Sequence, residues 1–447
     1  MAGGLLQLVA YGAQDAYITG NPQITFFKGL FKRHTNFAME AFRVNFNGQA
    51  GWGTKHSAIL GRNADLLYST YLEVVLAPGV YNYAGSGTGA GAGFNLIKYV
   101  ELDIGGQIID RQYGEWMYLW SELSLPLDAR FALASMTTVG SASSNNNQMT
   151  VISSTQCGGG GQPGLPNTMY IPLGFWFTRN PGAALPLIAL QYHEVKINLL
   201  WNTAQLIAGV FTQASSLADP IQAAIYCDYI FLDTEERRRM AQQSHEYLIE
   251  QTQFNEDKGI TSYMNRIDLT FNHPVKELVW VVQPSAYTNC QLAKNGSYYA
   301  VGGAGRTEAP ATDVLLPFTY DKSAVYEQWL QINGQDRMAK RYGDYYSKVQ
   351  PFQHHTGSFI FGNGGFNNNT LGGGGAYCYS FALRPEEHQP SGTCNFSRID
   401  TATLVLNMSG DVRVDQGTDN NWDVRVYALS YNILRVMSGM GGLAYSN

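Results

Sequence analysis

The side chains in this sequence that could do chemistry are scattered histidines, acids and cysteines, and none stands in a known catalytic pattern. The nucleophile elbow G-x-S-x-G, the zinc motif H-E-x-x-H and the Walker loop are absent. Glycine-rich stretches at 84–93, 158–161 and 372–375 lack the G-K-[ST] or the strand-to-helix context that a phosphate cradle requires. We therefore predict that they are flexible hairpin tips.

The adjacent histidines His354 and His355 are the candidates for metal ligation. Consecutive side chains on a strand point to opposite faces, so a strand here would keep them from sharing one ion. We therefore interpret them as buried or interface histidines. The cysteines are odd in number and lack C-x-x-C spacing, which predicts reduced thiols, no disulfide framework and no structural zinc site. They are Cys157, Cys227, Cys290, Cys378 and Cys394. We also expect no cofactor.

Acidic pairs are the remaining candidates for catalysis. Glycoside hydrolysis needs two carboxylates about 5–10 Å apart, and Glu386 with Glu387 or Asp110 with Glu115 could supply them. Because 35 acidic residues offer many such pairs, we assign no catalytic residue and predict that the protein is not an enzyme. A carbohydrate-binding or carbohydrate-cleaving protein remains an alternative, motivated by the acids and the aromatic residues.

Four asparagines stand in N-x-[ST] sequons and are candidates for covalent N-linked glycans. All four lie in the second half of the chain, at Asn295, Asn368, Asn395 and Asn407. Asn407 follows a strand-like run, so burial would compete with its modification.

The elements that must position these side chains are strands. Residues 66–76 (LLYSTYLEVVL) read as a buried strand that ends at a Pro-Gly turn. Residues 119–134 are helix-like, whereas further strands are expected at 42–46, 170–177, 195–200, 224–232, 275–282, 403–407 and 424–434. Closely spaced strands, Gly, Pro and Asn turns and no βαβ alternation predict antiparallel sandwiches or jelly rolls.

One motif occurs twice, about half the chain length apart. Residues 102–118 read LDIGGQIIDRQYGEWMY and residues 330–346 read LQINGQDRMAKRYGDYY. In each, Gly-Gly or Asn-Gly predicts a tight hairpin turn that is followed by a Tyr-Gly pair. Two looser likenesses have a similar spacing, namely 66–76 with 275–282 and 229–232 with 431–434. The repeats predict two homologous β-domains.

A charged segment that begins at Asp233 separates the two halves. Asp233 can cap a helix whose first turn is acidic and whose arginines at 237–239 follow, as the helix dipole prefers. With the polar residues after it, this segment reads as a connector. We predict an N-terminal arm at 1–25, a first domain at 26–233, a linker helix and connector at 234–260, a second domain at 261–437 and a tail at 438–447.

The composition limits the partners. Charged residues make up 14% of the chain, below the roughly 25% usual for globular domains, which fits a β protein covered largely by other protein. The net charge of −6 argues against direct binding to nucleic acid. No apolar run is long enough for a transmembrane segment, and the amino terminus lacks a signal-type pattern, which predicts no secretion. The cluster Lys28, Lys32, Arg33 and His34 is interpreted as a solvated edge or subunit contact, with phosphate or lipid headgroups as the alternative.

Several of these segments resemble the major capsid proteins of nucleocytoplasmic large DNA viruses, in particular the chlorella-virus (phycodnavirus) type. The resemblance rests on 3–28 (GGLLQLVAYGAQDAYITGNPQITFFK), 32–42 (KRHTNFAMEAF), the paired hairpins and 432–447 (NILRVMSGMGGLAYSN). It implies an all-β fold of two consecutive eight-stranded antiparallel jelly rolls with a short linking helix.

The resemblance also implies a function and partners. The chain would form homotrimers, which are pseudo-hexagonal capsomers tiling an icosahedral virion shell over an internal membrane, after synthesis and assembly in the host cytoplasm. Neighbouring capsomers and minor capsid proteins beneath the shell would be its partners, with the arm at 1–25 on the inner face. Outer loops would carry glycans at sites that need not be sequons. A minor or penton-associated capsid paralogue is the alternative within this family.

Overall fold

The computed structural model describes most of the chain in segments. These are residues 10–29, 31–76, 82–83, 93–137, 167–204, 211–212, 219–220, 222–285, 324–359, 376–408 and 421–445. The glycine-rich stretches at 158–161 and 372–375, nearly all of 84–93, and the sequons at Asn295 and Asn368 lie outside them. The chain divides into two compact units, Met1–Phe37 and Ala38–Asn447.

The first unit has no core of its own. Its helix α2 (Ala16–Thr19) is a single turn, in which the carbonyl of Asp15 accepts a hydrogen bond from the Thr19 hydroxyl at 2.7 Å. No described residue of 10–29 or 31–37 is buried. Large apolar side chains, among them Tyr17, Phe26 and Phe27, are exposed.

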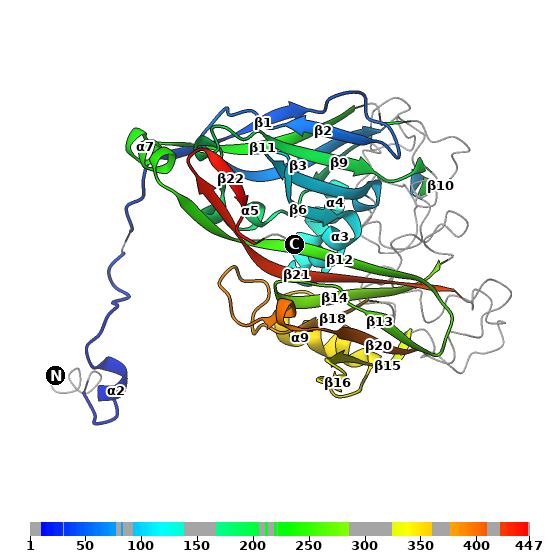
Figure 1. The fold of residues 1–447 in the computed structure, drawn as a ribbon. Coiled ribbons are helices and arrows are strands. Elements are labelled where there is room, and N and C mark those ends of the chain that lie inside the picture. The colour runs from blue at the N-terminus through cyan, green and yellow to red at the C-terminus, as the bar shows by residue number, and fades with distance from the viewer. Residues whose placement is uncertain are drawn as a thin grey trace, which may run out of the picture. The chain divides into compact units, whose positions relative to one another are not determined.

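The second unit consists mainly of antiparallel sheets (Figure 1). In its first half, one sheet has the order β1 (Phe37–Asn45), β11 (Gln222–Leu232), β3 (Leu66–Leu76), β7 (Asn167–Pro172), and β8 (Leu185–Pro186) also pairs with β3. The other has the order β2 (Lys55–Ile59), β9 (Val195–Trp201), β5 (Ile97–Ile104), β6 (Gln107–Tyr113). The short strand β10 (Phe211–Thr212) pairs with β4 (Asn82–Tyr83).

The second half contains two further sheets. One has the order β12 (His245–Ile260), β21 (Trp422–Met437), β14 (Pro274–Pro284), β18 (Ala376–Ser380), and β19 (Cys394–Asn395) and β22 (Met440–Leu443) join β14 and β21. The other has the order β13 (Met264–Asp268), β20 (Ala402–Met408), β15 (Val325–Ile332), β16 (Gln335–Asp336), with β17 (Arg341–Tyr342) also on β15.

The two halves repeat one pairing scheme. Strands β1, β11, β3 and β7 correspond in order to β12, β21, β14 and β18, and β2, β9, β5 and β6 correspond to β13, β20, β15 and β16. The three sequence repeats fall on equivalent elements: β3 with β14, the β5–β6 hairpin with β15–β16, and β11 with β21. The predicted double jelly roll of antiparallel strands is confirmed.

The repeated hairpins have the turns that their residues predict. Ile104 pairs with Gln107 across Gly105 and Gly106, whose φ angles are 62° and 89°. The second copy places Asn333 and Gly334 at φ 51° and 73°. Positive φ at both central residues is the type I′ geometry, which matches the twist of the flanking strands.

The helices lie mainly between strands. After β6 come α3 (Gly114–Ser124) and α4 (Leu127–Thr137), as expected for 119–134, while α9 (Gln350–His354) follows a π-helical turn at Tyr345–Val349. Short 3-10 turns stand at Phe94–Leu96, Pro181–Ala183, Leu187–Ala189 and Phe396–Arg398. The strand expected at 170–177 ends earlier, at Pro172, although the amide of Leu173 still donates to the carbonyl of Thr70 at 3.0 Å, and α5 (Trp176–Arg179) forms the rest of that segment.

The predicted connector is mostly a strand. Helix α7 (Thr234–Gln242) begins after Asp233, which takes the N-cap position, but its side chain makes no capping hydrogen bond, contrary to the prediction. From His245 the chain forms β12, which pairs with β21 along nearly its whole length. Its buried residues include Glu250, Gln251 and Thr252. A half-buried strand is recognised in a sequence by alternating apolar and polar residues. Because polar residues also occupy the buried face of β12, this alternation is missing there.

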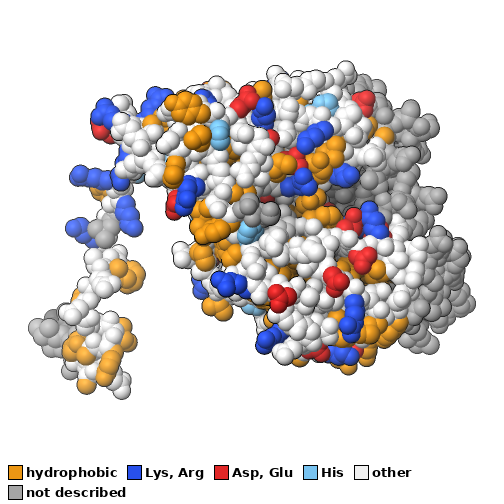
Figure 2. All heavy atoms as spheres, viewed as in Figure 1, with side chains coloured by type: hydrophobic (Ala, Val, Ile, Leu, Met, Phe, Trp, Pro, Cys, Tyr) orange, Lys and Arg blue, Asp and Glu red, His pale blue; other side chains and the backbone are white. Residues whose placement is uncertain are grey.

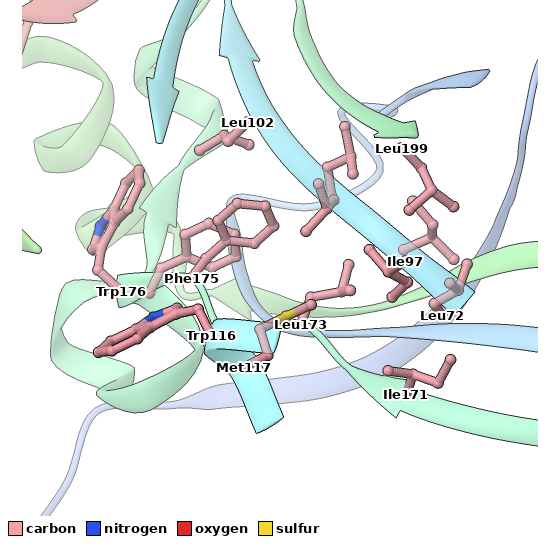
Figure 3. Close-up of a cluster of buried hydrophobic side chains, with 14 of the residues drawn as sticks. Leu72, Ile97, Leu102, Trp116, Met117, Ile171, Leu173, Phe175, Trp176 and Leu199 are labelled. Carbon is pink, nitrogen blue, oxygen red and sulfur yellow. The ribbon is translucent and has the colours of Figure 1, made fainter. Parts of the chain in front are cut away.

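The core runs from the first half into the second. Figure 3 shows Leu72, Ile97, Trp116 and Ile171 among the buried side chains that β3, β5, α3 and β7 bring together. The same cluster includes residues of the second half: Val279, Val281, Tyr427, Leu429, Leu434 and Val436. A further cluster fills the second jelly roll, with Trp280 and Tyr377 among its members. No helix in the described part of the chain is long and apolar enough to cross a membrane.

Candidate functional site

The surface along which the two jelly rolls meet, here called the seam, holds buried charges. Glu115 in the first turn of α3 accepts hydrogen bonds from Nε and Nη2 of Arg425 on β21, at 2.6 and 2.7 Å. The hydroxyl of Tyr427 also donates to Glu115, and Gln283 accepts from the guanidinium. Arg425 is only 8% exposed. This bidentate pair therefore fixes α3 of the first half to the central sheet of the second.

A second charged group crosses the seam at Glu250. Its carboxylate accepts from Arg179 of the first half at 2.7 Å and from Lys276 of β14 at 2.6 Å. The Arg179 guanidinium also lies over the ring of Trp120, 4.5 Å from its centroid. Burial lowers the pKa of Lys276, and the charge of Glu250 opposes this effect. The anion thus compensates two cations that are withdrawn from water.

Asp110 on β6 faces the middle of β12 across the seam. Its carboxylate accepts from the amide of Gln112 at 2.6 Å and from the backbone amide of Thr252 at 3.2 Å. Burial raises the pKa of Asp110 from 3.8 to about 6, although these hydrogen bonds oppose the increase. The folded protein therefore prefers the protonated form of Asp110. The stability that this preference contributes is fully present below pH 3.8 and is lost as pH rises through about 6.

Aromatic rings fill the space between these polar groups. Tyr113 lies 4.6 Å from Phe254, and Phe254 lies 5.2 Å from Tyr427, measured between ring centroids. Trp116 lies 5.6 Å from both Tyr427 and Trp120. Tyr113 and Trp116 belong to the first half and Phe254 and Tyr427 to the second, so the seam has the packing of a domain core.

The acidic pairs that the sequence offered for catalysis have separate partners. Asp110 and Glu115 contact different residues of the second half, as described above. Glu386 accepts from the backbone amide of Thr356 at 2.8 Å, whereas Glu387 accepts from Arg384 at 3.0 Å. The structure therefore uses Asp110 and Glu115 as seam contacts.

The two adjacent histidines end a helix instead of lying on a strand. The expectation of a strand was wrong because His354 closes α9 and His355 is its C-cap. His354 lies at the surface, with Nδ1 3.2 Å from the carbonyl oxygen of Leu383. The side chain of His355 is 0% exposed and stands edge-on to Trp120 at 6.2 Å. For His355, the interpretation as a buried histidine is confirmed.

His355 lies between two carboxylates. Its Nε2 is 2.6 Å from Oε1 of Glu277, and its Nδ1 is 3.1 Å from Oε1 of Glu386. Burial alone would lower the pKa of His355, but Glu277 and the hydrogen bonds to Cys378 and Glu386 raise it to about 12. Burial raises the pKa of Cys378 to about 11, opposed by its hydrogen bond to His355. Donor atoms of Glu277, His355 and Cys378 all lie within 4.8 Å of one another.

Two of the four predicted glycan sites fall on described residues. Asn395 is exposed at the end of β19, and its side-chain oxygen accepts from the amide of Ser397 at 3.1 Å. Asn407 is half-buried near the end of β20, which pairs on both sides, and its Nδ2 lies 3.4 Å from Oε2 of Glu327.

Sequence reasoning missed the seam. The available signal was charge inside apolar strand runs, since Lys276 stands in VKELVWVV and Arg425 in VRVYALSYNIL. Charged residues are almost never fully buried unless they are paired. Their positions predict buried partners, but the identity of those partners depends on how the two halves meet.

Two protein-family models match this chain. The model described as large eukaryotic DNA virus major capsid protein matches residues 236–442, and the model described as major capsid protein N-terminus matches 25–233. The major capsid protein of Pyramimonas orientalis virus is 45% identical, and that of Paramecium bursaria Chlorella virus 1 is 41% identical. Each of these alignments covers 100% of this chain and of the relative.

Solved structures are similar as well. The crystal structure of PBCV-1 VP54, fitted into a reconstruction of the virophage Sputnik, gives a TM-score of 0.72 at 37% identity and covers 95% of this chain and 100% of that one. The Faustovirus major capsid protein gives a TM-score of 0.68 at 14% identity, over 97% of this chain and 96% of that one. The second likeness supports the fold alone.

Proposed function

Because this chain belongs to the family of large eukaryotic DNA virus major capsid proteins, and is thus a structural component of a viral capsid, we propose that it assembles as a homotrimeric capsomer. Three chains with two similar jelly rolls each give a ring of six similar domains. Such a ring has a nearly hexagonal outline and can tile an icosahedral shell, here one that encloses an internal membrane. Heterologous contacts closed by a three-fold axis suffice to build it from one chain.

The seam is the observation that carries this proposal. A tile keeps its shape only if its domains do not move relative to one another. Most contacts between domains of one chain resemble transient interfaces that permit motion. Here the bidentate pair of Glu115 with Arg425, the group around Glu250 and a shared apolar cluster join the two jelly rolls. Each chain would therefore enter the trimer as one rigid body.

The surface supports extensive contact with other protein. On the face drawn in Figure 2, basic and acidic side chains are interspersed, and apolar side chains lie among them. Exposed aromatic residues include Tyr326 and Tyr342, which stack edge-on at 5.3 Å, and Phe26 and Phe27 in the first unit. We propose neighbouring capsomers and minor capsid proteins as the partners, with the arm at 1–25 contacting them on the inner face near the internal membrane.

Solution mass tests the trimer. Light scattering behind a sizing column is expected to give a single species near three times 49.3 kDa, unchanged on dilution because obligate interfaces are large and apolar. Electron microscopy of the same fraction should show hexagonal outlines. A stable monomer under these conditions would contradict the proposal.

Abundance separates the major capsid role from that of a minor or penton-associated paralogue. Purified virions should show this chain as the dominant band on a gel, and fractionation of infected cells should find its newly assembled form in the cytoplasm. A trace band would favour the paralogue. The carbohydrate-cleaving alternative is not favoured, since the acids Asp110 and Glu115 serve the seam.

We propose glycan attachment as a modification of the exposed loops. Of the described sequons, Asn395 is the better acceptor, because its side chain is exposed, whereas Asn407 is half-buried beside Glu327. Asn295 and Asn368 stay candidates on sequence grounds. Peptide mass spectrometry of protein from virions would identify the occupied positions.

A further inference from the structure

A buried group of three donor side chains lies beside the seam. Glu277 comes from β14, Cys378 from the neighbouring strand β18, and His355 from the end of α9. In the ladder between β14 and β18, Cys378 is paired with Val279, two residues along the strand from Glu277. Residues two apart on a strand point to the same face, so Cys378 and Glu277 project from the same side of the sheet. His355 meets them from α9.

The group is dry, and its charges are incompletely compensated. The side chains of Glu277 and His355 are 0% exposed, and Cys378 is 1% exposed. Oε1 of Glu277 contacts His355, but its Oε2 is buried without a hydrogen-bond partner among the described residues. An unsatisfied buried carboxylate oxygen carries a large desolvation cost. A cation between these side chains would remove that cost.

The donor set indicates which cation. One thiol sulfur, one imidazole nitrogen and a carboxylate are ligands that Zn²⁺ accepts, whereas Mg²⁺ and Ca²⁺ prefer oxygen alone. All three donor groups lie within 4.8 Å of one another. We propose that Glu277, His355 and Cys378 bind one zinc ion, with both oxygens of Glu277 contributing.

An outer partner already holds the histidine in a ligating orientation. Nδ1 of His355 faces Oε1 of Glu386 at 3.1 Å, so Nε2, which lies 2.6 Å from Oε1 of Glu277, is the nitrogen that would bind the ion. Glu386 is itself fixed by the amide and hydroxyl of Thr356. Metal-bound histidines commonly donate their other nitrogen to such a carboxylate. Zinc binding would displace the thiol proton of Cys378 and the proton between His355 and Glu277, so it releases protons.

The ion would strengthen the seam. The segment after His355 contacts α3 and α4 of the first jelly roll: the amide of Gly357 donates to the carbonyl of Leu123 at 2.6 Å, and Arg130 donates to the carbonyl of Ser358 at 3.0 Å. Zinc would anchor this segment to the central sheet of the second jelly roll. It would thereby act as a clip between the halves of the chain.

Metal content tests the proposal directly. The full-length protein, expressed with added zinc and dialysed against metal-free buffer, is expected to retain one zinc per chain by plasma mass spectrometry. Cobalt exchanged into the site should give a near-ultraviolet thiolate-to-cobalt absorption band. The variant C378S should lose that band, whereas C227S, which alters a buried cysteine on β11, should keep it.

A second variant separates ligation from folding. E386Q leaves all three ligands in place, so it should keep the cobalt band while weakening zinc binding by about 10–100-fold in a chelator competition. This result would support the proposal even if C378S proved unstable. Wild-type protein without stoichiometric zinc and without a thiolate-to-cobalt band would overturn it, as would equal loss of the band in C227S and C378S.

Discussion

The buried ion pair of Glu115 with Arg425 should contribute more to stability than the exposed ion pair of Glu246 with Arg435, although both arginines lie on β21. Replacing Glu115 by Gln keeps the size of the side chain but removes the charge opposite Arg425, which is 8% exposed. An uncompensated buried charge costs about 3–5 kcal/mol. We therefore expect E115Q to lower the free energy of unfolding by about that amount.

The matched control is the pair of Glu246 with Arg435, which lies on β12 and β21 and joins no element of the first half. Its Arg435 Nε–Glu246 Oε1 distance of 2.8 Å is close to that of the buried pair, yet the two side chains are 57% and 49% exposed. Exposed pairs contribute about 0–1 kcal/mol. We expect E246Q to cost less than about 1 kcal/mol, because water replaces the lost partner.

Urea unfolding followed by tryptophan fluorescence measures both variants, since Trp116 and Trp120 lie at the seam. A double-mutant cycle with R425M isolates the pairwise energy, and E115Q combined with R425M should cost clearly less than the sum of the single changes. Equal midpoint shifts for E115Q and E246Q, at equal slopes, would refute the claim that the buried pair fastens the two jelly rolls.

Three further outcomes are expected. The fold opposes ionisation of Asp110, and D110N removes that ionisation. In pH-dependent unfolding, the free energy of unfolding of D110N relative to wild type should therefore rise by up to about 3 kcal/mol between pH 3.8 and about 6, a difference of about 2.2 in pKa, and then stay level. A difference that does not change with pH would contradict this. G114A places a methyl group against the carbonyl oxygens of Ile97 and Phe94. Thermal unfolding should therefore show a free energy of unfolding that is lower by about 1–3 kcal/mol. The control G51A has room for a Cβ, so its stability should change little. Peptide mass spectrometry should find Asn407 unmodified, and a glycan there would show that half-burial does not protect it.

Predictions from the local sequence were correct where adjacent residues in the chain determine the backbone conformation. Gly105 with Gly106, and Asn333 with Gly334, required positive φ and gave the predicted hairpins. The prediction failed at β12, where the polar residues of the buried face are stabilised by groups from the other jelly roll. At His355 it failed because α9 ends there, so the alternation of side chains on a strand did not apply.

The sequence by itself determined the class of the fold, its duplication and the family resemblance, because turn residues, apolar strand runs and repeated motifs are local features. Only the tertiary structure decided which buried charges meet. Glu115 and Arg425, or Glu277, His355 and Cys378, are far apart in the chain and lack any short spacing motif. One sheet, the start of α3 and the end of α9 bring them together, and their exclusion from water makes each interaction strong enough to matter. A zinc site that has no short spacing motif is invisible in the sequence. The absence of C-x-x-C spacing therefore predicted no zinc site, although the folded chain brings together three side chains of types that bind zinc.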